Sequence, residues 1–142
     1  LAIEAATIAT WPDGAVLDSF LVRSRERPAA NLLAEAFEAH LHGALPVAAM
    51  PDLTLAVDNH ALPWHTSVIV SGPDQPGALL AVSTAFARAK LVVHTARVAS
   101  RGASIDDRFT VTDRLGHKLT DASMHVVQQY LAGEKTPRWP RR

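Results

Sequence analysis

The 142-residue chain contains no cysteine, and this absence removes several classes of site. Disulfides, thiolate zinc sites and cysteine nucleophiles are excluded, and the composition fits a reducing compartment, so we expect a cytoplasmic protein. No apolar run approaches the ~18 residues that a membrane-spanning helix needs, so no membrane partner is expected. Lysine plus arginine and aspartate plus glutamate both number 14, which gives a formal net charge of zero. A neutral chain lacks the positive charge that drives general nucleic-acid binding, so no nucleic-acid partner is expected.

An internal repeat is the most informative feature of the residues that are present. Two pairs of stretches alternate apolar with small or polar side chains, as strands do. The matching stretches are 6–10 with 96–100 and 17–22 with 106–111. In both second stretches an aspartate precedes a phenylalanine by two positions, Asp18 before Phe20 and Asp107 before Phe109. Two such hairpins in one chain predict two copies of one domain.

Helical patterns follow both hairpins. Pro28 suits the first turn of one helix, and Gly43 follows its last periodic residue. Thr120 is the expected N-cap of the other helix, and Gly133 marks its end. The apolar stripes that these helices would bury are Leu33, Phe37 and Leu41 in the first and Met124, Val127 and Leu131 in the second.

Only the second copy has an upstream half, with a strand at 66–71, a turn at 72–77 and a helix at 78–90. The order of strand, helix, strand, strand and helix predicts an α+β fold of the ferredoxin-like βαββαβ type. The first copy begins at its second strand. We therefore expect tandem ferredoxin-like domains, the first truncated at its N-terminus, in a piece of a longer protein. Residues 53–57 would supply the closing strand of the first copy.

These patterns set the expected domain boundaries. We predict the C-terminal part of the first domain at 1–58, a linker at 59–65, the second domain at 66–134 and a flexible tail at 135–142. A truncated first copy would leave an open sheet edge and exposed apolar surface. We therefore also expect a homodimer.

The turn from Gly72 to Gly77 is the segment best suited to bind a ligand. It joins a strand to a helix, so the unpaired N–H groups of the first helical turn would face a ligand beside it. Gly77 allows close approach of the backbone, and the helix dipole would stabilise a carboxylate there. Asp74 could pair with an ammonium group, and the combination suits a free amino acid. An ordinary strand–helix turn explains the same pattern and, from the pattern alone, is the more frequent case.

Neither a metal site nor a catalytic site is predicted. The seven histidines are scattered and suggest no cluster of four ligands. They stand at positions 40, 42, 60, 65, 94, 117 and 125. His94 would open the second strand of its copy near the Asp74 loop, so a ligand role is open to it. Asp106 and Asp107 are adjacent on a strand and would face opposite sides, which is the wrong geometry for paired carboxylates. We expect Asp18 and Asp107 to support turns or dimer contacts.

The residues from Gly72 to Leu80 resemble the first loop of ACT domains, which are small-molecule regulatory modules of amino-acid and nitrogen metabolism. That loop usually reads aspartate, arginine, proline, glycine, leucine, leucine. Gln75 and Ala78 depart from this pattern, so an arginine contact to a ligand carboxylate is missing. The predicted ligand-binding residues are Asp74, Gln75, Pro76, Gly77, Ala78, Leu79 and His94.

Three further stretches, 57–61, 94–102 and 107–119, resemble the tandem ACT domains at the C-terminal end of the PII uridylyltransferase/uridylyl-removing enzymes. The resemblance implies a parent enzyme that attaches and removes a uridylyl or adenylyl group on a PII signalling protein. Glutamine would be sensed by the ACT pair, and Mg would be bound by the catalytic domain. The Gly-Ser and His-Asp dipeptides of such catalytic domains do not occur here, so we expect neither cofactor nor catalytic residue in this chain. The alternative is an ACT-like dimerisation module that binds no small molecule.

Overall fold

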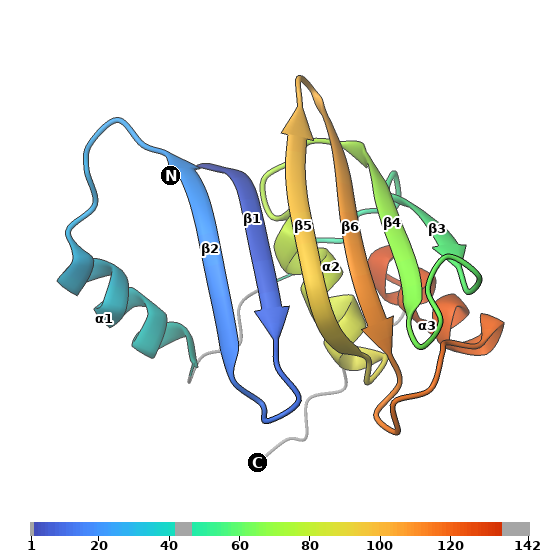
Figure 1. The fold of residues 1–142 in the computed structure, drawn as a ribbon. Coiled ribbons are helices and arrows are strands. Elements are labelled where there is room, and N and C mark those ends of the chain that lie inside the picture. The colour runs from blue at the N-terminus through green and yellow to red at the C-terminus, as the bar shows by residue number, and fades with distance from the viewer. Residues whose placement is uncertain (1, 42–46, 135–142) are drawn as a thin grey trace, which may run out of the picture.

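The computed structural model describes residues 2–41 and 47–134, and these residues form six strands and three helices. The strands make one antiparallel sheet in the order β2-β1-β5-β6-β4-β3, with α2 and α3 against one face and α1 beside β2 (Figure 1). The elements are β1 (Ala2–Thr10), β2 (Val16–Arg23), α1 (Ala30–Leu41), β3 (Thr54–Asp58), β4 (Thr66–Pro73), α2 (Ala78–Arg88), β5 (Val92–Arg101), β6 (Ser104–Thr112) and α3 (Asp121–Leu131). The predicted α+β class and ferredoxin-like arrangement are confirmed.

The hairpins β1–β2 and β5–β6 repeat each other in register as well as in sequence. Phe20 lies opposite Ala6 in the first hairpin, and Phe109 lies opposite Ala96 in the second. These are equivalent positions of the sequence repeat. Because side chains alternate between the faces of a sheet, equal registers place equivalent residues on the same face. The predicted duplication is therefore confirmed for the two hairpins.

The two hairpins join through β1 and β5, which pair antiparallel with each other. The middle of this ladder pairs Thr7 with Arg97, and these two residues are themselves equivalent in the repeat. On either side Ala6 pairs with Val98, and Ile8 pairs with Ala96. Equivalent residues thus exchange partners across the ladder, so an approximate twofold axis passes between β1 and β5.

The position of β3 corrects one expectation. The strand predicted at 53–57 is present, but it does not close the first copy. It pairs antiparallel with β4, with Leu55 opposite Val70, and forms the outer strand beside the second hairpin. There it occupies the place of the fourth strand in the order β5-β6-β4-β3 of a ferredoxin-like unit. The domain boundaries stay a prediction, but in space β3 belongs with β4, β5, β6, α2 and α3, which we call the second unit. The first unit consists of β1, β2 and α1.

Two local contacts explain why the chain before β3 lies against the second unit. Met50 is buried in the core of this unit, and its N–H donates to the Leu131 carbonyl at 2.7 Å, at the end of α3. Gly72 in β4 faces the chain just before β3. A Cβ at this position would lie 2.8 Å from the carbonyl oxygen of Asp52 and from Cδ2 of Leu53. Glycine therefore lets the two backbones approach.

The core lies between the sheet and the two helices α2 and α3. Phe86 of α2 and Phe109 of β6 meet edge to face, with ring centroids 5.1 Å apart. The predicted apolar face of the second helix is confirmed, because Met124, Val127 and Leu131 are all buried. Thr120 is its N-cap, as predicted, and its hydroxyl accepts a hydrogen bond from the Ser123 N–H at 3.3 Å. None of the helices described has the length and apolar character needed to cross a bilayer.

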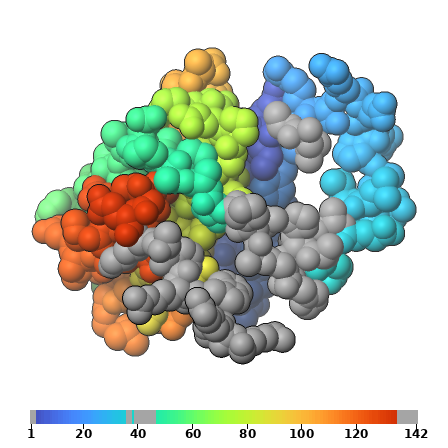
Figure 2. Space-filling view, turned by 180° about the vertical axis from the view of Figure 1, so that it is seen from behind, coloured from blue at the N-terminus to red at the C-terminus, as the bar shows by residue number. Residues whose placement is uncertain are grey.

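The first unit is much less covered than the second. Every residue of β2 is exposed, and Figure 2 shows β2 and α1 on the opposite side of the molecule from α3. α1 makes no extensive contact with any other described element, and its Leu33 is exposed. The side chains of Phe37 and Leu41, together with Gly43 and the tail at 135–142, lie outside the described residues. The two hairpins therefore have the same register, but other elements bury the β5–β6 hairpin more than the β1–β2 hairpin.

Candidate functional site

A cavity of about 630 Å³ lies between the start of α2 and the strands β1, β5 and β6. Its volume is in the range of small-molecule sites. All six predicted loop residues, 74–79, line it. The other lining residues are Ile3 of β1, Leu80 and Ser83 of α2, Val98 and Ser100 of β5, and Ile105 and Asp107 of β6. The fold thus gathers the predicted loop residues around one space, and their role as ligand contacts stays a prediction.

Backbone hydrogen bonds hold the loop at 74–77 in place. The Asp74 N–H donates to the Ala103 carbonyl at 2.9 Å, which ties the loop to the β5–β6 turn. Gly77 precedes α2 with φ +87°, a left-handed conformation that side-chain-bearing residues rarely adopt. No side chain caps this end of the helix. The sequence therefore forms a tight turn that leaves the helix start open to the cavity.

Two backbone donors at the start of α2 are available to a ligand. The Ala78 N–H donates to the Gln75 carbonyl at 3.1 Å, and the Ala81 N–H to the Gly77 carbonyl at 2.9 Å. Between them, the N–H groups of Leu79 and Leu80 meet no acceptor within residues 2–41 and 47–134. Both residues line the cavity. Together with the helix dipole, such donors favour a bound anion such as a carboxylate.

Asp107 is a site residue whose place the sequence analysis missed. We expected it to support a turn or a dimer contact, but it lies in mid-strand on the cavity wall with a relative exposure of 1%. Its Oδ1 accepts a hydrogen bond from the Ala99 N–H at 3.1 Å. Burial raises the pKa of the Asp107 carboxyl and outweighs this N–H, and the charges of Asp74 and Asp106 add to the rise.

A signal for Asp107 is present in the sequence. Along β6, alternate residues face the core, and the inward set is Ile105, Asp107, Phe109 and Val111. An aspartate in an otherwise apolar, inward-facing series is a buried charge, and buried charges need a reason. Asp106 faces the other side, as predicted, and pairs with Arg108 at 3.6 Å.

The part of the chain that contains this site matches a known family. The ACT domain family matches residues 66–124, which run from the start of β4 into α3. Residues 66–124 are an ACT domain. The loop at 74–77, the start of α2 and Asp107 all lie within it, and Ile3 reaches the same cavity from outside.

Curated relatives extend the similarity beyond the ACT domain. The bifunctional uridylyltransferase/uridylyl-removing enzyme of Rhodospirillum rubrum is 30% identical over 96% of this chain and 17% of its own length. The enzyme of the same name from Nitrobacter winogradskyi is 33% identical over 81% of this chain and 15% of its own. The ACT domain-containing protein ACR1 of Arabidopsis thaliana is 35% identical over 58% and 17%. The chain thus spans about a sixth of the length of these relatives. No solved structure matches significantly.

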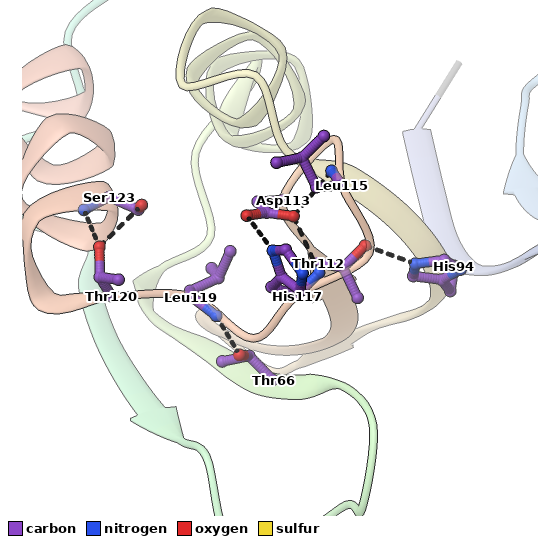
Figure 3. A network of polar contacts seen from close by, with 9 residues as sticks. All are labelled: Thr66, His94, Thr112, Asp113, Leu115, His117, Leu119, Thr120 and Ser123. Carbon is purple, nitrogen blue, oxygen red and sulfur yellow. Dashed lines mark hydrogen bonds and ion pairs between the residues drawn. The ribbon is translucent and has the colours of Figure 1, made fainter.

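His94 lies at the other end of the ACT domain's sheet from the loop near which we expected it. Its Nε2 is 2.8 Å from the Thr112 hydroxyl (Figure 3). The centroids of the His94 and His65 rings are 4.5 Å apart. His65 directly precedes β4, whereas Asp74 directly follows it, so the strand separates His94 from the cavity. Burial, and then the charge of His65, lower the pKa of His94. The expected position near Asp74 is wrong because β5 enters the sheet at the opposite end.

The predicted linker at 59–65 is tied to the loop after β6. Lys118 donates through Nζ to the carbonyls of Asn59 and Leu62, at 2.5 and 2.6 Å. Asn59 in turn donates to the Leu119 carbonyl at 3.0 Å. Among the described residues, no group of three or more His, Cys, Asp or Glu side chains is arranged to hold a metal ion. The hydrogen bonds of Asn59 and Lys118 therefore connect the linker to the loop after β6.

Proposed function

We propose that this chain is the amino-acid-sensing region of a uridylyltransferase/uridylyl-removing enzyme that modifies a PII signalling protein, and that its ligand is glutamine. The observation that carries the proposal is the cavity at the start of α2, in an ACT domain whose chain is similar to such enzymes over 96% of its length. A ligand carboxylate would accept from the N–H groups of Leu79 and Leu80. Its ammonium group would face the carboxylates of the cavity.

The charges of the cavity favour glutamine over glutamate. The ionisable side chains among its lining residues are Asp74 and Asp107, and both are acidic. A glutamate side chain would add a further carboxylate near them, which costs electrostatic free energy. The neutral amide of glutamine avoids this cost and can hydrogen-bond with neutral polar groups such as Gln75 and Ser100.

The position of the cavity also suits regulation. Ile3 comes from the first hairpin, whereas all other lining residues come from the ACT domain. A ligand bound there would contact both sides of the β1–β5 ladder. It would therefore favour the relative arrangement of the two units in which the ligand contacts the lining residues of both. The size of this bias equals the difference in the ligand's affinity for the alternative arrangements.

Glutamine is expected to raise the thermal unfolding midpoint of the chain, and Gly77→Asp is expected to abolish this rise. At about 100 times Kd, a ligand stabilises the native state by about 2.7 kcal/mol, which corresponds to roughly 5–10 °C for a chain of this size. Aspartate tolerates positive φ better than most residues. A Cβ at position 77 would lie 3.8 Å from Met50 Cε, so there is space for it. The added carboxylate would repel that of the ligand.

Gly77→Asn is the matched control, because asparagine has the same shape without the charge. We expect it to retain most of the glutamine-dependent rise, as measured by scanning calorimetry. A midpoint that does not respond to any of the twenty amino acids would contradict the ligand proposal and leave the fold unaffected.

Dimerisation is a second candidate function, and the exposed strand β2 favours it. Leu17 and Leu21 are 62% and 61% exposed on a strand whose outer edge has no partner among the described residues. Such an edge can pair with a second chain. We expect a dimer in light scattering that Leu21→Lys converts to a monomer, whereas Leu115→Lys, at another exposed leucine, leaves it intact. A chain that is monomeric at all concentrations would exclude this function.

A further inference from the structure

The two carboxylates of the cavity have different surroundings. Asp74 is exposed in the loop before α2, where water solvates its charge. Asp107 is 1% exposed and has one backbone donor, the Ala99 N–H. Among the described residues Asp107 forms no ion pair. Burying a carboxylate without a cation costs free energy, so a buried, unpaired carboxylate on a cavity wall favours a positively charged ligand group.

Comparison with the other copy of the repeat shows that an aspartate at this position is not buried in both hairpins. Its counterpart Asp18 occupies the equivalent position of the first hairpin, two residues before Phe20, and is exposed. Its neighbour Asp106 lies on the other face of β6 and pairs with Arg108. Of these three carboxylates, Asp107 alone lines the cavity.

The cavity therefore offers complementary groups to the two charges of a free amino acid. Leu79 and Leu80, whose N–H groups meet no acceptor among the described residues, line it from α2, and Asp107 lines it from β6. An exposed ion pair with Asp74 would add little affinity because water screens it, whereas a pair with a desolvated carboxylate is much stronger. We propose that Asp107 is the residue that recognises the α-ammonium group of the ligand. This inference rests on the proposed function and assigns its selectivity for amino acids to one side chain.

Calorimetric titration of four chains with two ligands tests the assignment. The ligands are glutamine and its analogue without the α-amino group, 4-carbamoylbutanoate. The chains are the native one, Asp107→Asn, Asp106→Asn and Asp74→Asn. We expect Asp107→Asn to weaken glutamine binding by roughly 10- to 100-fold and to change binding of the analogue by less than about threefold. Asp106→Asn, outside the cavity, should change glutamine binding by less than about threefold, and Asp74→Asn should weaken it less than Asp107→Asn does, because water screens the exposed carboxylate.

Stability without ligand is a second readout. Because the native carboxyl of Asp107 keeps its proton to a higher pH than the unfolded one, the ionised group destabilises the fold at neutral pH. The acidic groups whose charges act on it are Asp74, which lines the same cavity, and Asp106, on the other face of β6. We therefore expect Asp107→Asn to unfold at a higher temperature than the native chain at pH 7. This difference should shrink as the pH falls and disappear below about pH 3, where the unfolded carboxyl is also protonated.

Three outcomes separate the assignment of Asp107 from the proposed function. If native chain and Asp107→Asn bind glutamine equally, the assignment of Asp107 is overturned while the proposed function stands. An Asp107→Asn chain that is less stable than the native one at pH 7 would show that the carboxylate supports the fold, and would also overturn the assignment. If the native chain binds no amino acid, the proposed function fails and the assignment fails with it.

Discussion

Replacing Phe109 by alanine is expected to lower the free energy of unfolding by about 3–5 kcal/mol. Phe109 is 4% exposed in the core of the ACT domain, and its ring packs edge to face on Phe86. Alanine would remove this contact and leave a cavity between β6 and α2, where rigid neighbours can fill it only in part. Urea denaturation followed by circular dichroism measures the loss.

The internal repeat supplies the matched control. Phe20 is the counterpart of Phe109, opposite Ala6 as Phe109 is opposite Ala96, but it is 47% exposed. Phe20→Ala should therefore cost less than about 1 kcal/mol. Equal losses at both positions would contradict the unequal cover of the two hairpins, and would indicate that another surface buries Phe20 in solution.

The second large effect is expected for Thr66→Val, which should destabilise the chain by about 2–3 kcal/mol. The Thr66 side chain is fully buried at the start of β4. Its hydroxyl donates to Oδ1 of Asn59 at 2.5 Å. It also accepts from the Leu119 N–H at 2.8 Å (Figure 3). Valine has nearly the same shape but leaves both partners unsatisfied. The linker and the loop before α3 would then lose one of their shared links, while the hydrogen bonds of Asn59 to Leu119 and of Lys118 to the linker carbonyls remain.

Thr95→Val is the control for Thr66→Val. The Thr95 hydroxyl also makes a hydrogen bond, to the Thr110 hydroxyl at 2.8 Å, but on the exposed face of the sheet. Water can replace this partner, so we expect a change of less than about 0.5 kcal/mol by the same urea titration. A loss at Thr66 as small as that at Thr95 would contradict the role of the buried hydroxyl.

The candidate site was accessible from the sequence in part. The loop at 74–79 could be predicted because a strand, a turn with proline and glycine, and a helix follow each other directly, and all of its residues line the cavity. Asp107 could have been predicted from its place among the inward-facing residues of β6. Leu80 directly follows this stretch, and Ser83 lies one helical turn further along α2. Ile3 comes from the first hairpin, so only the assembled sheet brings it to the site.

The sequence by itself determined the local features of this protein. The repeated hairpins, the N-cap of α3 and the glycine before α2 depend on neighbouring residues, because alternation, capping and positive φ act over a few positions. Tertiary structure alone decided that β3 pairs with β4, that the hairpins join through β1 and β5, and that His94 lies away from the loop. These depend on which strand edges meet and in which register. Segments far apart in sequence make that choice together, through the apolar surface and backbone hydrogen bonds that each arrangement satisfies.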